Sequence, residues 1–366
     1  MTTAPLDLGA GTTGSVWDAV VGQPMAVRRL IASAANPLHA YLFVGPPGST
    51  KNEASRAFAA LLLAGVDDPH QRDARLALTG QHPDVREFAR VGATISSAQA
   101  DEIIRLAALA PNESDRKVLI LDEFHLLTPE GAAKLLKTIE EPPPSTVFIV
   151  LADFMPPDLV TIASRCIRID FQPIATEVII ETLLGEGAPA ERVAEAAAAA
   201  NGDLTRARLL ANDTHLAARR AMFAGLPARL DGTGSAVIAS VDSLLAEIEA
   251  AAAPLTARHA EEVAAMEERI ASLGERGSGK KALEERHKRE LRRHRIDELR
   301  AGLATLAGTY RDAVVDGSMA RPETAAKAVK RIHDALEALD RNPNEQLLLQ
   351  ALLLELPALR ADRVDH

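Results

Sequence analysis

Short apolar runs alternate with helix-period segments through the first half of this 366-residue chain. The apolar runs are rich in Val, Ile, Leu and Phe, which fits strands that are buried on both faces of a parallel sheet. The alternation of strand and helix predicts an α/β domain with right-handed crossovers. The expected strands are residues 40–45, 117–123 and 145–153, and the expected helices between them are residues 53–64, 97–109 and 130–140.

The second half of the chain has a different pattern, because the strand signal ends after Pro173. Residues 176–213 predict a few short helices, and the pattern from about residue 215 onward is helical and rich in Ala and Leu. The length predicts two or three domains. The expected division is a flexible leader (1–15), an α/β core (16–173), a small helical domain (174–213) and a larger all-helical domain (214–366).

A highly charged stretch at residues 275–300 stands apart from the rest of the larger helical region. Glu284 and Lys288 are four residues apart, as are Glu285 and Arg289, in the order that supports an exposed helix. The stretch predicts a solvated helical hairpin with residues 257–273. A basic arm that contacts nucleic acid is the alternative.

Composition narrows the class of protein. The net charge of −10 argues against a generally basic, nucleic-acid-coating surface, although one local DNA-binding face is compatible with it. No apolar run is long enough to span a bilayer, and the N-terminus lacks the pattern of a signal peptide. Cys166 is the single cysteine, which excludes an intramolecular disulfide and a multi-cysteine zinc site. A cytoplasmic protein without membrane contact is expected.

Residues 45–52, GPPGSTKN, follow an expected strand and precede an expected helix, as a phosphate-binding P-loop does. Gly45, Gly48 and Lys51 occupy P-loop positions, but Thr50 replaces the glycine before the lysine and Asn52 replaces the hydroxyl residue after it. A β-branched Thr50 would resist positive φ, and Asn52 could offer Mg²⁺ only an amide oxygen. Tight nucleotide binding and fast hydrolysis are not expected. Weak binding of ATP or ADP with Mg²⁺ and a vestigial loop without ligand both stay open.

The segment VLILDEF (118–124) is an apolar strand that ends in Asp122 and Glu123. This is the Walker B pattern, in which the aspartate holds Mg²⁺ and the glutamate polarises the attacking water. The intact Walker B motif favours nucleotide binding, whereas the altered P-loop argues against it. Mg²⁺ at Asp122 therefore stays open, and Glu123 is a candidate catalytic residue that is idle if no nucleotide binds.

Ser164, Arg165 and Cys166 precede a further short apolar strand. An arginine at a domain edge can complete a neighbouring subunit's ATP site as an arginine finger. An ordinary surface arginine is the alternative. Cys166 fits a small buried apolar residue.

Together these motifs resemble a family. VVGQPMAVRRL, HAYLFVGPPG, HPD, KVLILDEFHLLTPEGAAKLLKTIEEPP, TVFIVLAD and TIASRC occur in the order typical of bacterial clamp-loader AAA+ proteins. The chain resembles delta prime subunits of DNA polymerase III most and gamma/tau subunits next, strongly over residues 16–173. The resemblance implies an AAA+ P-loop core with a parallel sheet, a helical lid (174–213) and an all-α collar (214–366) with a charged insertion at about 250–300.

The resemblance also implies roles for single residues. Gly22 and Gln23 fall in the adenine-side segment, Asp153 falls near sensor 1, and Arg206 falls near sensor 2. Arg165 would reach a neighbouring ATPase subunit. An acid at position 153 would repel phosphate, a further departure from an active site. Nucleotide-binding positions carried over in degenerate form are Gly45, Gly48, Thr50, Lys51, Asn52, Asp122, Asp153 and Arg206.

The implied function is that of a delta prime-like stator, which helps to load the sliding clamp on primed DNA and hydrolyses little or no ATP itself. The implied partners are gamma/tau and delta subunits and, through the complex, the clamp and primer-template DNA. No zinc is expected, because the stretch before HPD has no cysteine. Ser96 or Ser97 could cap a helix that faces a DNA phosphate, although an ordinary N-cap is the alternative. An active gamma/tau-like ATPase and an AAA+ helper outside the clamp loader are the rival functions.

Overall fold

The computed structural model describes residues 14–90, 94–273, 280–319, 321–339 and 343–359. The chain divides into two compact units, Met1–Arg208 and Leu209–His366. Most of the expected leader and residues 274–279 of the charged stretch lie outside the described residues. Within the described ranges, no helix is long and apolar enough to cross a membrane.

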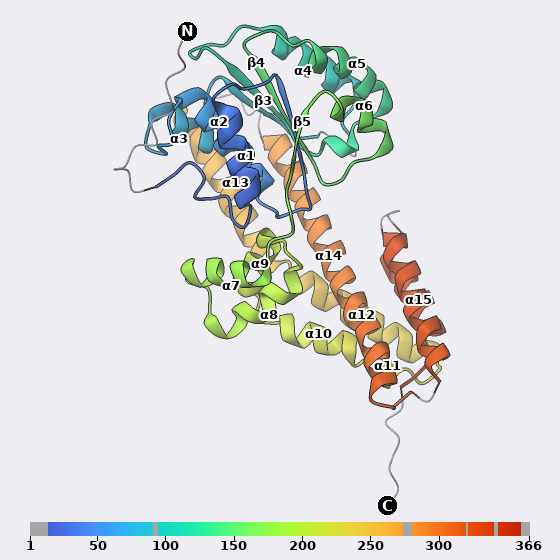
Figure 1. Cartoon of the computed structure of the whole chain (residues 1–366). Helices are drawn as coiled ribbons and strands as arrows, with labels where there is room; N and C mark the ends of the chain where they lie inside the picture. Colours follow the sequence, from blue (N-terminus) through green and yellow to red (C-terminus); the bar gives the residue numbers. More distant parts are fainter. Residues whose placement is uncertain (1–13, 91–93, 274–279, 320, 340–342, 360–366) are drawn as a thin grey trace, which may run out of the picture. The chain divides into compact units, whose positions relative to one another are not determined.

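The first unit is built on a parallel sheet with helices around it (Figure 1). The sheet has five strands in the order β2-β3-β4-β1-β5. The predicted α/β fold with a parallel sheet is confirmed. One strand, β2, was not predicted, because its exposed Arg86 and Glu87 interrupt any apolar run. The strands are β1 (Ala40–Val44), β2 (Val85–Phe88), β3 (Lys117–Leu121), β4 (Thr146–Ala152) and β5 (Ile167–Asp170).

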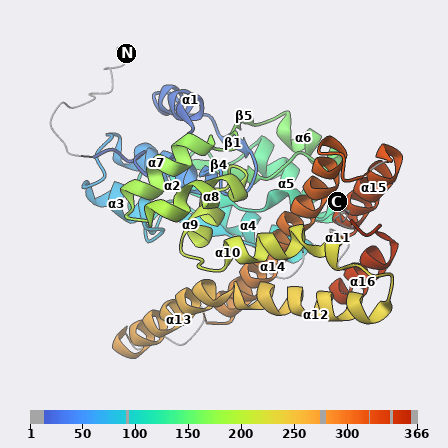
Figure 2. The same cartoon turned by 90° about the horizontal axis from the view of Figure 1, so that it is seen from below.

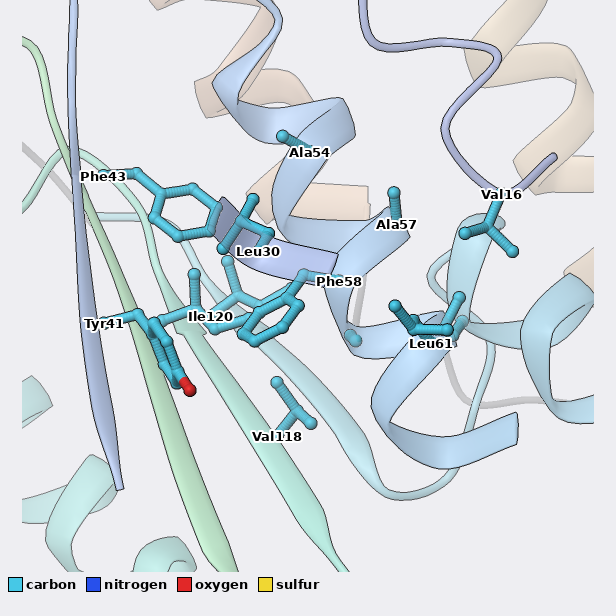
Figure 3. Packing of buried hydrophobic residues seen from close by; sticks show 14 of the residues in the cluster. Val16, Leu30, Tyr41, Phe43, Ala54, Ala57, Phe58, Leu61, Val118 and Ile120 are labelled. Atoms are coloured by element: carbon cyan, nitrogen blue, oxygen red, sulfur yellow. The ribbon is translucent and has the colours of Figure 1, made fainter. Parts of the chain in front are cut away.

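Both faces of this sheet are buried. Because successive side chains of a strand point to opposite faces, neighbouring residues of one strand lie in different cores. Tyr41 and Phe43 of β1 pack with the helices of one face. There the rings of Phe58 and Tyr41 meet edge to face, with their centroids 4.8 Å apart (Figure 3). Leu42 and Val44 belong to the core on the opposite face. This double burial explains why β1, β3 and β4 are continuous apolar runs.

Helices cover the two faces in separate groups. α1, α2 and α3 supply one core, and α4, α5 and α6 supply the other. Three short helices, α7, α8 and α9, follow the sheet. The helices are α1 (Pro24–Ala34), α2 (Lys51–Ala64), α3 (Arg72–Leu78), α4 (Ser97–Ala108), α5 (Pro129–Glu140), α6 (Val160–Ala163), α7 (Thr176–Gly185), α8 (Ala190–Ala200) and α9 (Leu204–Ala211), with 3-10 turns η1 (Phe124–Leu126) and η2 (Pro157–Leu159).

The second unit is all-helical over its described residues, as predicted (Figure 2). Its core is rich in leucine. α10 and α14 approach closely at Gly302, where an added Cβ would lie 2.2 Å from the Phe223 ring. Arg219 of α10, only 3% exposed, also bonds Glu298 of α14 at 3.0 Å. The helices are α10 (Leu216–Ala224), α11 (Leu226–Arg229), α12 (Gly234–Ala250), α13 (Ala253–Leu273), α14 (Lys280–Val315), α15 (Pro322–Leu339) and α16 (Glu345–Glu355).

Candidate functional site

The loop from β1 to α2 has the course of a P-loop. Gly45 has no room for a side chain, because an added Cβ would lie 2.5 Å from Phe171. Thr50 stands where a P-loop has glycine and takes the left-handed conformation, with φ of 60°. A β-branched residue is strained there. The Thr50 hydroxyl compensates in part by donating to the carbonyl of Val21 at 3.1 Å.

The P-loop cation has its partner inside the chain. Lys51 Nζ lies 2.6 Å from a carboxylate oxygen of Asp153 and 3.2 Å from the carbonyl oxygen of Pro46. The Lys51 side chain is 5% exposed and that of Asp153 is 28% exposed. Asp153 directly follows β4, which pairs with β1, so adjacent strand ends bring the two residues together. The sequence predicted that Asp153 repels phosphate, and the structure adds that Asp153 neutralises Lys51.

The Walker B aspartate is also engaged within the chain. The amide nitrogen of Asn52 donates to Asp122 Oδ2 at 3.2 Å, and the Glu123 N–H donates to Asp122 Oδ1 at 2.8 Å. Burial raises the pKa of Asp122 above its usual range, against the effect of these hydrogen bonds. The amide oxygen of Asn52 was left open as a ligand for Mg²⁺, and in the structure the amide nitrogen of Asn52 faces the carboxylate.

Glu123, the candidate for polarising water, pairs with Arg90 Nε at 2.8 Å and has φ of 50°. The Asp153 N–H donates to Nδ1 of His125 at 3.2 Å. Burial lowers the pKa of His125, which favours the neutral imidazole. Asp122 and Glu123, the two acids of the Walker B motif, thus both have partners within the chain.

The turn between α8 and α9 lies directly on the P-loop. The Leu204 N–H donates to the carbonyl of Gly48 at 3.2 Å, and the Asp203 carboxylate accepts from the Arg206 N–H at 2.8 Å as the cap of α9. An added Cβ on Gly48 would lie 1.8 Å from Asp203 Oδ1. The sequence-predicted Arg206 thus lies on the helix that begins beside the P-loop. Sequence reasoning did not single out Asp203 as a site residue, and its place after Asn-Gly in a region of short helices was the available signal.

These contacts fit a bound Mg-nucleotide poorly. Lys51 is neutralised by Asp153, Asp122 is engaged by Asn52, and Asp203 adds a carboxylate over the loop that would hold phosphates. Phosphate oxygens are repelled by carboxylates and need unpaired donors. No hydrolysis step follows from this arrangement.

Arg165 lies near the amino ends of the parallel strands, whereas the P-loop lies at their carboxyl ends. Ile167, two residues after Arg165, is paired with Tyr41 at the start of β1, whereas the P-loop begins after Val44 at the end of β1. With a strand rise of about 3.3 Å per residue, this separation is roughly 10–13 Å of sheet. Arg165 is therefore not part of the site that contains Lys51.

The remaining predicted positions have local roles. Ser164 Oγ accepts from Arg165 Nη1 at 3.2 Å, and burial raises the pKa of the Cys166 thiol to about 12. Ser96 is the N-cap of α4 and accepts from the Gln99 N–H at 3.3 Å, and Ser97 is the first residue of that helix. Sequence reasoning missed Arg90 and Glu140 as charge partners, because only the folded sheet brings them to Glu123 and Arg165.

The strand order, the P-loop course and the acidic end of β3 define an AAA+ type P-loop domain with a short helical segment over the loop. Residues 22–175 match the family model described as "DNA polymerase III, delta subunit". Over these residues the chain matches the bacterial clamp-loader family of AAA+ proteins.

Two curated relatives from Bacillus subtilis are similar to about 40% of this chain. DNA polymerase III subunit tau is 38% identical over 151 residues, which are 39% of this chain and 26% of tau. DNA polymerase III subunit delta' is 31% identical over 150 residues, which are 40% of this chain and 46% of delta'. A solved DNA polymerase III gamma subunit-related protein from Thermotoga maritima has a TM-score of 0.42 and 16% identity, covering 90% of this chain and 97% of its own. The match thus spans about a quarter to a half of the curated relatives.

Proposed function

We propose that this chain is a delta prime-like stator subunit of a bacterial clamp loader. It donates Arg165 in trans to the ATP site of a neighbouring gamma/tau-type subunit and hydrolyses little or no ATP itself. Gamma/tau and delta subunits are its partners, and the sliding clamp and primer-template DNA are reached through the complex. A cytoplasmic location accompanies this role in replication.

The observation that carries the proposal is the separation of Arg165 from the chain's own P-loop. Arg165 precedes β5 at the amino end of that strand, and Lys51 follows β1 beyond its carboxyl end. An arginine at the amino ends of the strands can act on a phosphate only if another molecule supplies the phosphate. The contacts of Lys51, Asp122 and Gly48 support the second half of the proposal, because they leave the chain's own site ill-suited to nucleotide.

The test is the ATPase rate of a complex reconstituted from this chain with gamma/tau and delta subunits. Arg165→Ala should lower the rate by about 10³-fold at the affected site, the scale of a finger supplied in trans. Arg168→Ala is the matched control, because Arg168 is an exposed arginine on β5 that pairs with Asp170. An Arg165→Ala complex with the rate of the Arg168→Ala complex would refute the proposal.

An active gamma/tau-like ATPase is the second candidate, favoured by the retained Asp122 and Glu123 and by the similarity to tau. Turnover by the isolated chain that disappears in Lys51→Ala would support it. A silent isolated chain would exclude it. An AAA+ helper outside the clamp loader, with DNA bound through residues 275–300, is separated from both by its failure to co-purify with gamma/tau and delta.

The expected segments remain part of the proposal: a core (16–173), a lid (174–213) and a collar (214–366) with a charged insertion at about 250–300. The collar would assemble with the helical regions of other subunits. A DNA contact at the start of α4 is a further element, because the Ser96 cap leaves other first-turn N–H groups available to a phosphate.

A further inference from the structure

The guanidinium of Arg165 is held along one side by its own chain. Nη1 donates to the carbonyl of Thr161 at 2.7 Å and to Ser164 Oγ at 3.2 Å. Nε lies 3.1 Å from Glu140 Oε2 as an ion pair, although no acceptor lies in line with its N–H bond. Among the described residues, Nη2 has no partner. The Arg165 side chain is 30% exposed, so part of it can be reached by another molecule.

Glu140 is carried by a well-anchored element. It is the last residue of α5, which buries Leu135 and Ile139 in the core and is capped at its start by the hydroxyl of Thr128. The end of a helix also favours a nearby cation, because its last carbonyls carry partial negative charge. Arg165 at this end of α5 is therefore drawn to one place by both the helix and Glu140.

We infer that Glu140 is a positioning residue that fixes the Arg165 guanidinium for a phosphate of the neighbouring subunit. The inference rests on the proposed function. Without the Nε contact, Arg165 is anchored only through Nη1, and more rotamers of this long side chain become accessible. The freedom of a long side chain would then have to be lost each time it reaches the phosphate, which corresponds to about three- to tenfold in rate.

A purely structural role predicts something else. Glu140 is 47% exposed on its side chain, and ion pairs of exposed groups contribute little to folding stability. Glu140→Ala should therefore fold normally, so any loss of partner activity reports on Arg165. Glu141 is the matched control, because it is the exposed neighbouring glutamate and has no ion pair among the described residues.

The experiment measures steady-state ATP hydrolysis by the full complex with gamma/tau and delta. It compares Glu140→Ala, Glu140→Gln, Glu141→Ala, Arg165→Ala and the Glu140→Ala/Arg165→Ala double variant. Glu140→Ala should lower kcat about three- to tenfold with little change in KM for ATP. Glu140→Gln, which keeps an acceptor without the charge, should fall between Glu140→Ala and the wild type. The double variant should equal Arg165→Ala, because Glu140 acts only through Arg165.

The outcomes separate the two proposals. A loss in Arg165→Ala with Glu140→Ala equal to Glu141→Ala would overturn the role of Glu140 alone. A double variant slower than Arg165→Ala by the full Glu140→Ala factor would do the same. An unaffected Arg165→Ala complex would overturn the proposed function and, with it, this inference.

Discussion

The ammonium of Lys51 lies 2.6 Å from the carboxylate of Asp153, so the P-loop cation is neutralised within its own chain. The pair is asymmetric, because the Lys51 side chain is 5% exposed whereas Asp153 is 28% exposed. A charge that loses its partner costs more when water cannot reach it. The two halves of the pair should therefore differ in their effect on stability.

Asp153→Asn should destabilise the first unit by about 3 kcal/mol, because it leaves the buried ammonium of Lys51 without a counter-charge. Lys51→Met should cost only about 1 kcal/mol, since the remaining carboxylate can be hydrated. Thermal unfolding of the full chain measures both. Asp170→Asn, which breaks the exposed pair with Arg168, is the control and should change little. A more stable Asp153→Asn than Lys51→Met would contradict the role of the pair.

Gly48 and Gly65 allow the contact between the α8–α9 turn and the P-loop to be tested. Both have positive φ, 66° and 71°, but only Gly48 faces a neighbour, Asp203, where a Cβ would be added. Gly65→Ala should cost about 1–2 kcal/mol from backbone strain alone. Gly48→Ala should cost several kcal/mol, because the clash includes the Asp203 backbone and cannot be relieved by a side-chain rotation.

Hydrogen exchange distinguishes these two variants. In Gly48→Ala the amides of α8 and α9 should exchange faster than in the wild type, because the turn that rests on the P-loop is displaced. In Gly65→Ala they should be unchanged. Equal exchange in the two variants would mean that the turn does not depend on its contact with Gly48.

Asp84, in the HPD segment, should make stability pH-dependent. Its carboxylate is fully buried and accepts from the N–H groups of Asn112, Glu113 and Ser114. Burial alone would raise the pKa of Asp84, but these hydrogen bonds outweigh it and hold the pKa below its usual value. A carboxyl whose pKa is lower in the folded state stabilises the fold above its unfolded pKa of about 3.9.

The stabilisation by Asp84 should therefore be present at neutral pH and be lost as the pH falls below about 4. Asp84→Asn should destabilise the first unit at pH 7 by about 2–3 kcal/mol and flatten the acid limb of its melting temperature. Asp115→Asn is the control, because Asp115 is an exposed acid of the loop that holds Asn112, Glu113 and Ser114. An unchanged acid limb in Asp84→Asn would assign the acid sensitivity to other groups.

The sequence predicted those features that depend on neighbouring residues. The apolar runs of β1, β3 and β4 gave the sheet, and the P-loop and the Asp122–Glu123 pair follow strands whose ends were recognisable. β2 was missed because an edge strand with exposed Arg86 and Glu87 has no apolar run. In the second unit, Lys288 pairs with Glu285 rather than with Glu284, the partner suggested by the four-residue spacing.

The contacts that fill the candidate site could not be predicted, because they join residues far apart in the chain. Lys51 and Asp153 are 102 positions apart. They meet because β4 lies beside β1 in the strand order, which no local pattern encodes. The same holds for Asp203 on Gly48. Sequence reasoning could find the altered positions of a P-loop but not the side chains that compensate for them.

The motif R-H-x-x-E occurs on both helices of the charged hairpin, at 258–262 of α13 and 286–290 of α14. The histidine of each copy lies within hydrogen-bond distance of the glutamate of the other copy. His259 Nε2 lies 2.9 Å from Glu290 and His287 Nε2 lies 3.0 Å from Glu262, while the two rings stack with centroids 3.8 Å apart. Arg258 also pairs with Glu290. A polar cluster in a helix seam fixes register at a cost in stability.

Glu290→Ala should loosen α13, because it removes the partner of both Arg258 and His259 from the facing helix. The α13 amides near His259 should exchange about tenfold faster, equivalent to about 1.4 kcal/mol of local stability. Glu284→Ala, an exposed position of the same helix, should leave exchange unchanged. Hydrogen exchange with peptide resolution measures both variants in one experiment. If α13 exchanges alike in the two variants, its apolar residues and not the paired motifs determine the register of the hairpin.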